Sequence, residues 1–301
     1  MPVTSRDLLI PADDGYPLAA TLFEADDPEA RATRPMVIVG AATAVPRRYY
    51  APFARFLAAE GSRVLTFDYR GVGGSSPADL IGFAARMRDW GVLDTPGVLG
   101  WTLAQYPNAP IRWLGHSFGG FGPGLAHNNG AIERMLAISS MTAHWRLLPS
   151  PERYRVALLM GALLPGLTHA MRYFPGRLNG FENLPKGVLL EWARWCMTPG
   201  FLFGDESLGE RRYFAQLRSP VRLTLIEDDP WVSTASVEHL AAQFTGSPET
   251  SVWRIRPSDA GVRRIGHVGF FRSECAPTLW QDARAWLAGH ALSASSARPT
   301  S

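Results

Sequence analysis

The regular alternation of short apolar segments with longer amphipathic ones constrains the fold of this chain more than any other feature. Short aliphatic runs are typical of buried parallel strands, and apolar residues at helical spacing are typical of the helices that connect them. We therefore expect an α/β fold with a mostly parallel, twisted sheet flanked by helices, preceded by an N-terminal hairpin over residues 8–23. The expected strands are residues 36–39, 63–69, 111–114, 134–138, 221–226 and 251–255, and the expected helices are residues 49–61, 94–106, 237–244 and 278–287.

Residues 144–218 break this alternation. They are rich in Leu, Trp, Phe, Pro and Gly and show no clear strand pattern. We interpret them as an inserted helical cap on a core formed by residues 1–143 and 219–290, followed by a small-residue, polar tail at 291–301 that we expect to be disordered. The cap aromatics either line an apolar pocket or, as such residues more often do, attach the cap to the core. These aromatics are Trp192, Trp195, Phe201 and Phe203.

Composition and charge exclude several classes of partner. The 30 Lys and Arg residues stand against 27 Asp and Glu, and they are scattered instead of forming the basic stripe of a nucleic-acid binder, so we expect no nucleic-acid partner. No run of 18 apolar residues is present and no secretory signal pattern opens the chain, so we expect no membrane insertion. Two widely separated cysteines fit a reducing compartment, and we expect a cytoplasmic protein.

Gly115, Ser117 and Gly119 match the pattern G-x-S-x-G. A serine on a tight turn between a strand and a helix has strained backbone angles, and the two elements approach so closely that glycine is needed two residues to either side. The expected strand 111–114 lies directly before the motif. We therefore predict that Ser117 is a nucleophile and that the start of the following helix offers the Phe118 N–H to an oxyanion. An inert serine in a glycine-rich turn is the alternative interpretation.

A nucleophilic serine needs an imidazole as general base. Three histidines lie far enough downstream. His239 and His290 fall inside or at the end of expected helices, whereas His267 lies in a glycine-flanked loop after the last strand. Because the base must lean over the ends of the strands, we predict that His267 is the base.

The base in turn needs a carboxylate that holds its ring. Asp228 and Asp229 both follow the expected strand 221–226, and Asp229 stands next to a proline that favours a turn. We predict Asp229 as the acid, with Asp228 as the alternative; the other aspartate is expected to cap a turn. Asp259 is closer in sequence to His267 but follows a different strand.

Together these segments resemble the α/β-hydrolase family over most of residues 8–290. Residues 68–75 resemble the family's D-x-R-G-x-G-x-S turn, residues 227–232 its acid loop and residues 266–267 its base loop. The stretch at 40–43, with the Asp-Tyr-Arg-Gly and Gly-His-Val-Gly-Phe-Phe segments, most resembles a bacterial group of predicted hydrolases.

One departure from the family concerns the second oxyanion donor. Many members carry His-Gly after the third strand, where this chain has Gly40, Ala41 and Ala42. Because the donor is a backbone group, the N–H of Ala42, or of Ala41, is expected to serve beside Phe118.

The resemblance implies a serine hydrolase that transfers a small-molecule acyl group from an ester, thioester or amide to water, without a cofactor. The glycine-rich stretch 71–76 lacks the third glycine of a dinucleotide fingerprint, and the histidines show no metal-ligand spacing, so we predict no nucleotide cofactor and no metal. An acyltransferase with the same triad and a non-catalytic binding protein on the same fold are the alternatives.

Overall fold

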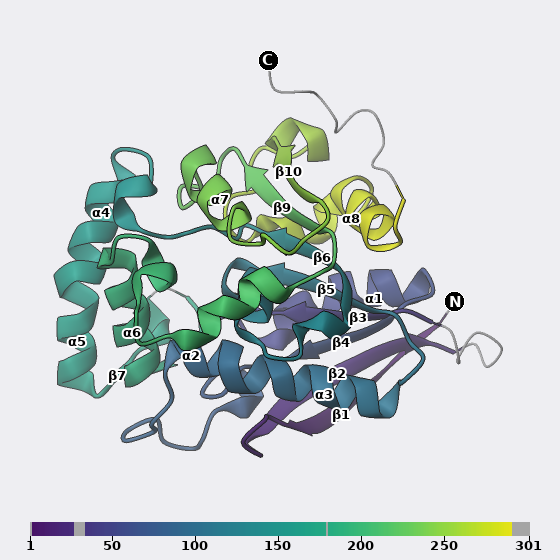
Figure 1. Cartoon of the computed structure of the whole chain (residues 1–301), viewed down its shortest axis with the longest axis horizontal. Coiled ribbons are helices and arrows are strands. Elements are labelled where there is room, and N and C mark those ends of the chain that lie inside the picture. Colours follow the sequence, from purple (N-terminus) through teal and green to yellow (C-terminus); the bar gives the residue numbers. More distant parts are fainter. Residues whose placement is uncertain (1, 27–33, 179, 291–301) are drawn as a thin grey trace.

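The computed structural model describes residues 2–26, 34–178 and 180–290, and its centre is an eight-stranded sheet (Figure 1). The strand order is β1-β2-β4-β3-β5-β6-β9-β10. β1 pairs antiparallel with β2, and β2 with β4, whereas the other neighbours in this sheet pair in parallel. The predicted mostly parallel sheet and its N-terminal hairpin are confirmed. The strands are β1 (Val3–Pro11), β2 (Pro17–Ala25), β3 (Met36–Gly40), β4 (Arg63–Phe67), β5 (Ile111–His116), β6 (Ile132–Ile138), β9 (Val221–Ile226) and β10 (Thr250–Ile255).

Helices flank the sheet, with α3 in front of it and α1 behind it in the view of Figure 1. α1 and α8 share one face, because Phe53 of α1 packs edge-on against Trp280 of α8 with ring centroids 5.2 Å apart. All residues of β3 and β4 are buried between the helical layers, as expected for aliphatic strands in the middle of a parallel sheet. The helices are α1 (Ala51–Ala59), α2 (Met87–Asp89), α3 (Thr95–Gln105), α4 (Glu152–Leu158), α5 (Leu164–Met171), α6 (Lys186–Met197), α7 (Thr234–Ala241) and α8 (Leu279–Leu287).

The parallel strands bring four loops to one edge of the sheet. β3 and β5 are in register with Gly40 opposite Gly115, and β5 continues in register with β6 up to His116 opposite Ile138. The loops that follow β3, β5, β6 and β9 therefore begin side by side. In open parallel sheets this carboxyl edge is where ligands bind.

The segment between β6 and β9 carries α4, α5 and α6, which lie together at the left of Figure 1. It also contains a short antiparallel pair, β7 (Tyr173–Phe174) and β8 (Leu184–Pro185). The sequence pattern did not indicate these strands, because two residues are too few to show an alternation. That residues 144–218 act as a cap on a core of residues 1–143 and 219–290 stays a prediction, and the expected tail 291–301 lies outside the described residues.

Candidate active site

Ser117 stands at the turn that directly follows β5, and its φ angle is +52°. A β-carbon on Gly115 would lie 2.1 Å from the carbonyl oxygen of Gly119, and one on Gly119 would lie 2.1 Å from that of Gly40. Glycine is therefore required at both positions, for the steric reason that the motif predicts. The left-handed backbone at Ser117 is a strained conformation of the kind that proteins keep at functional positions.

The turn continues differently from the expected regular helix. Three short 3₁₀ turns follow: η4 (Ser117–Gly120), η5 (Gly122–Leu125) and η6 (Asn129–Ala131). Glycines and Pro123 in this stretch disfavour a continuous α-helix, which explains the difference. The Phe118 N–H thus comes from a tight turn, and in the described part of the chain no group accepts a hydrogen bond from it.

His267 and Asp229 meet at this edge of the sheet. The Nδ1 atom of His267 lies 2.8 Å from Oδ2 of Asp229. The Asp229 side chain is fully buried, and its Oδ1 accepts the backbone N–H of Trp231 at 3.0 Å. Because a carboxylate can only accept hydrogen bonds, it holds the proton of His267 on Nδ1 and leaves Nε2 free to act as a base.

The neighbouring carboxylate has a separate structural role. The two oxygens of Asp228 accept the N–H groups of Ile265 and Gly266, each at 2.9 Å. Asp228 therefore fastens the loop that carries His267, while Asp229 contacts the ring itself. This arrangement differs from the expectation that the other aspartate would cap a turn, because Asp228 binds a distant loop and Asp229 itself accepts the N–H of Trp231 two residues further on.

The histidines and the aspartate that the sequence offered as alternatives to His267 and Asp229 lie elsewhere. Nδ1 of His239, in α7, lies 2.9 Å from the hydroxyl of Thr142, and His290 follows α8. Asp259 accepts the N–H of Arg256 at 2.9 Å. His239, His290 and Asp259 do not line the cavity described next.

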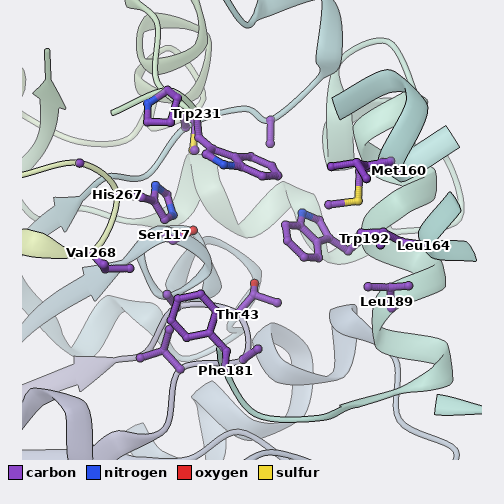
Figure 2. Close-up of a pocket in the computed structure, with 18 of the residues that line it drawn as sticks. Thr43, Ser117, Met160, Leu164, Phe181, Leu189, Trp192, Trp231, His267 and Val268 are labelled. Atoms are coloured by element: carbon purple, nitrogen blue, oxygen red, sulfur yellow. The ribbon is translucent and has the colours of Figure 1, made fainter. Parts of the chain in front are cut away.

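Ser117 and His267 line one cavity of about 630 Å³ (Figure 2). The Ser117 hydroxyl is not hydrogen-bonded to any other residue that the structure describes, so it is available to a ligand. In the described part of the chain no Asp or Glu lines the cavity, and most of the lining is apolar. Met141 and Ala143 line the cavity from the loop after β6. Residues 144–218 contribute Arg155, Leu159, Met160, Leu164, Phe174, Leu178, Phe181, Leu189, Trp192 and Phe201.

The four aromatic residues that the sequence analysis named within residues 144–218 have different surroundings. Trp192 and Phe201 line the cavity. Trp195 is buried and donates its indole N–H to Asp205 at 2.9 Å, and Phe203 packs against Phe214 with ring centroids 4.8 Å apart. Both of these partners lie within residues 144–218, but Phe203 also reaches the core, where its ring lies 6.0 Å from that of His239 in α7. The positions of Trp192 and Phe201 are consistent with the pocket interpretation, and that of Phe203 is consistent with the attachment interpretation.

Trp192 also connects the inserted segment to the acid loop. Its ring lies nearly parallel to that of Trp231, with centroids 6.0 Å apart and an interplanar angle of 25°. The Trp231 ring in turn lies 6.3 Å from that of His267. Figure 2 shows these three side chains facing the cavity together.

The loop after β3, where the second oxyanion donor is expected, is tied to the nucleophile turn. The Gly119 N–H donates to the carbonyl of Ala41 at 3.1 Å. The Ala42 N–H is already engaged, because it donates to the hydroxyl of Tyr50 at 2.9 Å. An oxyanion at this position must therefore share the Ala42 N–H with Tyr50.

Two buried residues that bond to Ala42 and His267, namely Tyr50 and His116, were not identified from the sequence. His116 lies with Nδ1 2.8 Å from the Tyr50 hydroxyl and Nε2 2.8 Å from the main-chain carbonyl oxygen of His267. Burial, helped by the nearby His267, lowers the pKa of His116 to about 3, so the ring is neutral. The available signal was a histidine at the end of an otherwise apolar buried strand, where a polar ring requires partners.

The described residues contain neither a candidate metal site nor a candidate membrane span. No group of three or more His, Cys, Asp or Glu side chains there is arranged to hold a metal ion. None of the helices in that part of the chain is both long and apolar enough to cross a membrane.

Solved structures similar to this one include several hydrolases. The esterase Pf2001 of Pyrococcus furiosus is 18% identical, with a TM-score of 0.57, and the match covers 95% of this chain and 93% of that one. A soluble variant of monoglyceride lipase from Saccharomyces cerevisiae is 15% identical, with a TM-score of 0.62 and coverage of 97% and 95%. The thioesterase domain from the curacin biosynthetic pathway is 13% identical, with a TM-score of 0.54 and coverage of 95% and 99%. At these identities the similarity shows the shared fold.

The sequence comparisons agree with the fold. No curated protein sequence matches the chain significantly. The model of the alpha/beta hydrolase family matches residues 36–274, which include the nucleophile turn, the acid loop and the base loop. The chain therefore belongs to the alpha/beta hydrolase family.

Proposed function

We propose that this protein is a serine hydrolase that cleaves a carboxylic ester, thioester or amide through an acyl-enzyme. The observation that carries the proposal is the hydrogen-bonded pair of His267 and Asp229 at a cavity that Ser117, on its strained turn, also lines. The printed descriptions of the structural neighbours, an esterase, a monoglyceride lipase and a thioesterase, are in line with this reaction class.

In the acylation step His267 is the general base. Its Nε2 takes the hydroxyl proton of Ser117 as the Ser117 oxygen attacks the acyl carbonyl, and Asp229 stabilises the imidazolium that forms. The N–H groups of Phe118 and Ala42 stabilise the oxyanion, each contributing about 3 kcal/mol in the transition state. His267 then gives its proton to the leaving alcohol, thiol or amine, and the acyl-enzyme remains.

In the deacylation step water takes the place of the leaving group. His267 removes a proton from the water, the hydroxide attacks the acyl carbon, and the same proton returns to Ser117 as the acid departs. The protons that move come from Ser117 and from water and are carried by His267, so the cycle requires neither a cofactor nor a metal.

The residues that line the cavity indicate the class of substrate. Residues 144–218, which we propose act as a cap, contribute mostly aliphatic, methionine and aromatic side chains, and the polar groups Ser117 and His267 lie in the core wall. An apolar cavity of about 630 Å³ beside the nucleophile fits the apolar acyl chain of a small-molecule substrate.

Covalent labelling tests the proposal without knowledge of the physiological substrate. A fluorophosphonate probe should label the native chain and should fail to label Ser117→Ala. Ser76→Ala, which removes a different serine hydroxyl from a glycine-rich turn, is the control and should label at the native rate. Absence of labelling in the native protein, or labelling that persists in Ser117→Ala, would refute the nucleophile.

A series of p-nitrophenyl esters then defines the reaction. Hydrolysis should rise with acyl-chain length, because longer chains bury more apolar surface in the cavity. Product analysis with added alcohol or thiol acceptors separates acyl transfer to water from transfer to another acceptor.

A further inference from the structure

A chain of three hydrogen bonds, two of them buried and the third partly buried, connects the loop after β3 to the main chain of His267. It runs from the Ala42 N–H to the Tyr50 hydroxyl at 2.9 Å, from Tyr50 to Nδ1 of His116 at 2.8 Å, and from Nε2 of His116 to the carbonyl oxygen of His267 at 2.8 Å. Tyr50 and His116 are fully buried, and Ala42 is 4% exposed. We call this chain the Tyr50–His116 relay.

The direction of every bond in the relay follows from its two ends. The carbonyl of His267 can only accept, so Nε2 of His116 carries the proton. Because the low pKa keeps the His116 ring neutral, Nδ1 is then an acceptor and the Tyr50 hydroxyl must donate to it. The lone pairs of Tyr50 are left to accept the Ala42 N–H. Every donor is matched with an acceptor, so the relay has one arrangement.

The relay ends at the two groups that the proposed reaction must hold in place. One end is the peptide N–H of Ala42, the second oxyanion donor. The other is the main chain of His267. His116 precedes Ser117 directly, so all three parts of the site are attached to one rigid unit.

The packing around the relay is consistent with a rigid unit. The rings of Tyr50 and His116 both lie against Phe271, with centroids 4.8 Å and 5.0 Å from it. The hydroxyl of the preceding residue, Tyr49, donates to the carbonyl of Val268 at 2.8 Å. Two successive carbonyls of the base loop are therefore held by groups from outside that loop.

We propose that Tyr50 and His116 are positioning residues, whose relay fixes the His267 main chain and the Ala42 peptide relative to Ser117 and thereby sets the rate of acylation. The proposal rests on the hydrolase function proposed above. Neither residue lines the cavity, so substrate affinity should not depend on them. Removing one bond of the relay should shift the base or the oxyanion donor, and small misplacements of catalytic groups cost about tenfold to a hundredfold in rate.

The central experiment compares Tyr50→Phe with Tyr69→Phe. Each substitution deletes one oxygen from a fully buried tyrosine, but Tyr69 lies outside the relay. Tyr50→Phe should lower both the rate constant of fluorophosphonate labelling and kcat about tenfold, with KM for a p-nitrophenyl ester changed less than twofold. Tyr69→Phe should leave these kinetic values within twofold of the native protein.

A second set of variants tests the His116 end. His116→Gln can keep a donor near the position of Nε2, whereas His116→Leu removes both hydrogen bonds. His116→Gln should therefore recover most of the labelling rate that His116→Leu loses. If the two residues act as one unit, adding Tyr50→Phe to His116→Leu should cause little further loss.

The outcomes separate this inference from the proposed function. If the native protein labels at Ser117 but Tyr50→Phe labels as fast as Tyr69→Phe, the relay has no positioning role and the hydrolase proposal stands. Fully additive losses in the double variant would also overturn the inference, as would a rise in KM with unchanged kcat. If the native protein does not label, the proposed function itself fails.

Discussion

The two walls of the cavity differ in the kind of interaction that each provides. The core wall carries Ser117, the ring of His267 and the loop around Ala42, and hydrogen bonds fix the His267 ring and the Ala42 N–H. The opposite wall, from residues 144–218, is apolar apart from Arg155 among its described lining residues, and Arg155 is paired with Glu152. In the proposed reaction, directional bonds hold the base that moves protons, and non-directional contacts meet the acyl chain. We infer that reaction rate depends on the first wall and substrate choice on the second.

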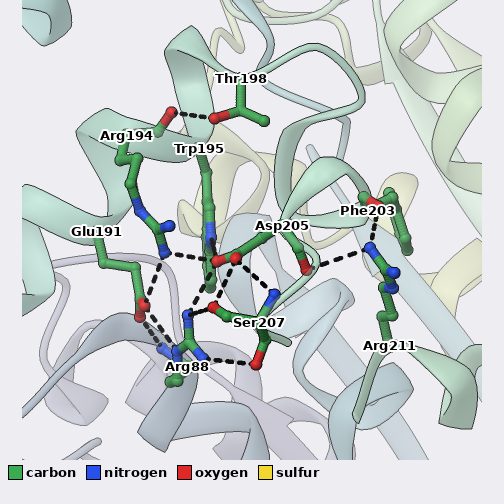
Figure 3. Close-up of polar contacts among 9 residues, drawn as sticks. All are labelled: Arg88, Glu191, Arg194, Trp195, Thr198, Phe203, Asp205, Ser207 and Arg211. Carbon is green, nitrogen blue, oxygen red and sulfur yellow. Dashed lines mark hydrogen bonds and ion pairs between the residues drawn. The ribbon is translucent and has the colours of Figure 1, made fainter. Parts of the chain in front are cut away.

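A cluster of ion pairs also attaches residues 144–218, which form the apolar wall, to α2 (Figure 3). The guanidinium of Arg88, next to the cavity-lining Met87, bonds Glu191 at 2.7 Å and Asp205 at 2.9 Å. Burial alone would raise the pKa of Asp205. Hydrogen bonds from Ser207 and Trp195 and the charge of Arg194 outweigh burial and lower this pKa to about 2. This cluster joins α2 to α6 and to the turn after α6.

The largest effect should come from the polar wall. Asp229→Asn should lower kcat by about four orders of magnitude, because the amide no longer stabilises the imidazolium and favours the wrong tautomer of His267. Asp228→Asn keeps one acceptor for the base loop and should cost about tenfold. Steady-state kinetics on a p-nitrophenyl ester give both values. The reverse ranking would transfer the acid role to Asp228.

A smaller effect should follow from breaking the attachment of the apolar wall. In Arg88→Met two buried carboxylates lose one of their two cations, since Arg194 still contacts both, and the free energy of unfolding should fall by about 2 kcal/mol. The control is Arg48→Met, which breaks a second ion pair between the described residues of the core and those of 144–218, the pair of Arg48 with Glu182. Arg48 and Glu182 are 73% and 29% exposed, so the change should stay below about 1 kcal/mol.

Urea unfolding of the two variants measures the difference. Equal losses of stability in Arg88→Met and Arg48→Met would show that the buried cluster does not fasten the inserted segment.

The contrast between the two walls also explains how much of this structure the sequence could predict. Strands such as β3 and β9 were located from aliphatic runs, and the glycines at 115 and 119 predicted a close approach, because local composition dictates both. The relay was not predictable, since Tyr50 and His116 meet across 66 residues and nothing local marks a tyrosine whose hydroxyl will face a histidine. The motif predicts a helix after Ser117, whereas the local Gly and Pro content disfavours one and gives the short 3₁₀ turns.

The smallest predicted effect concerns the choice of substrate. Trp192→Ala removes a large ring from the apolar wall, so kcat/KM for an octanoyl ester should fall about tenfold, in line with the 1–3 kcal/mol that small changes in an apolar pocket contribute. The acetyl ester should change less than twofold, since its short chain stays beside Ser117. Trp101→Ala removes the same ring from α3, away from the cavity, and should leave the octanoyl-to-acetyl ratio unchanged. If Trp192→Ala slowed both esters equally, Trp192 would act through its neighbour Trp231 on the base, and the assignment of rate to one wall and selectivity to the other would be wrong.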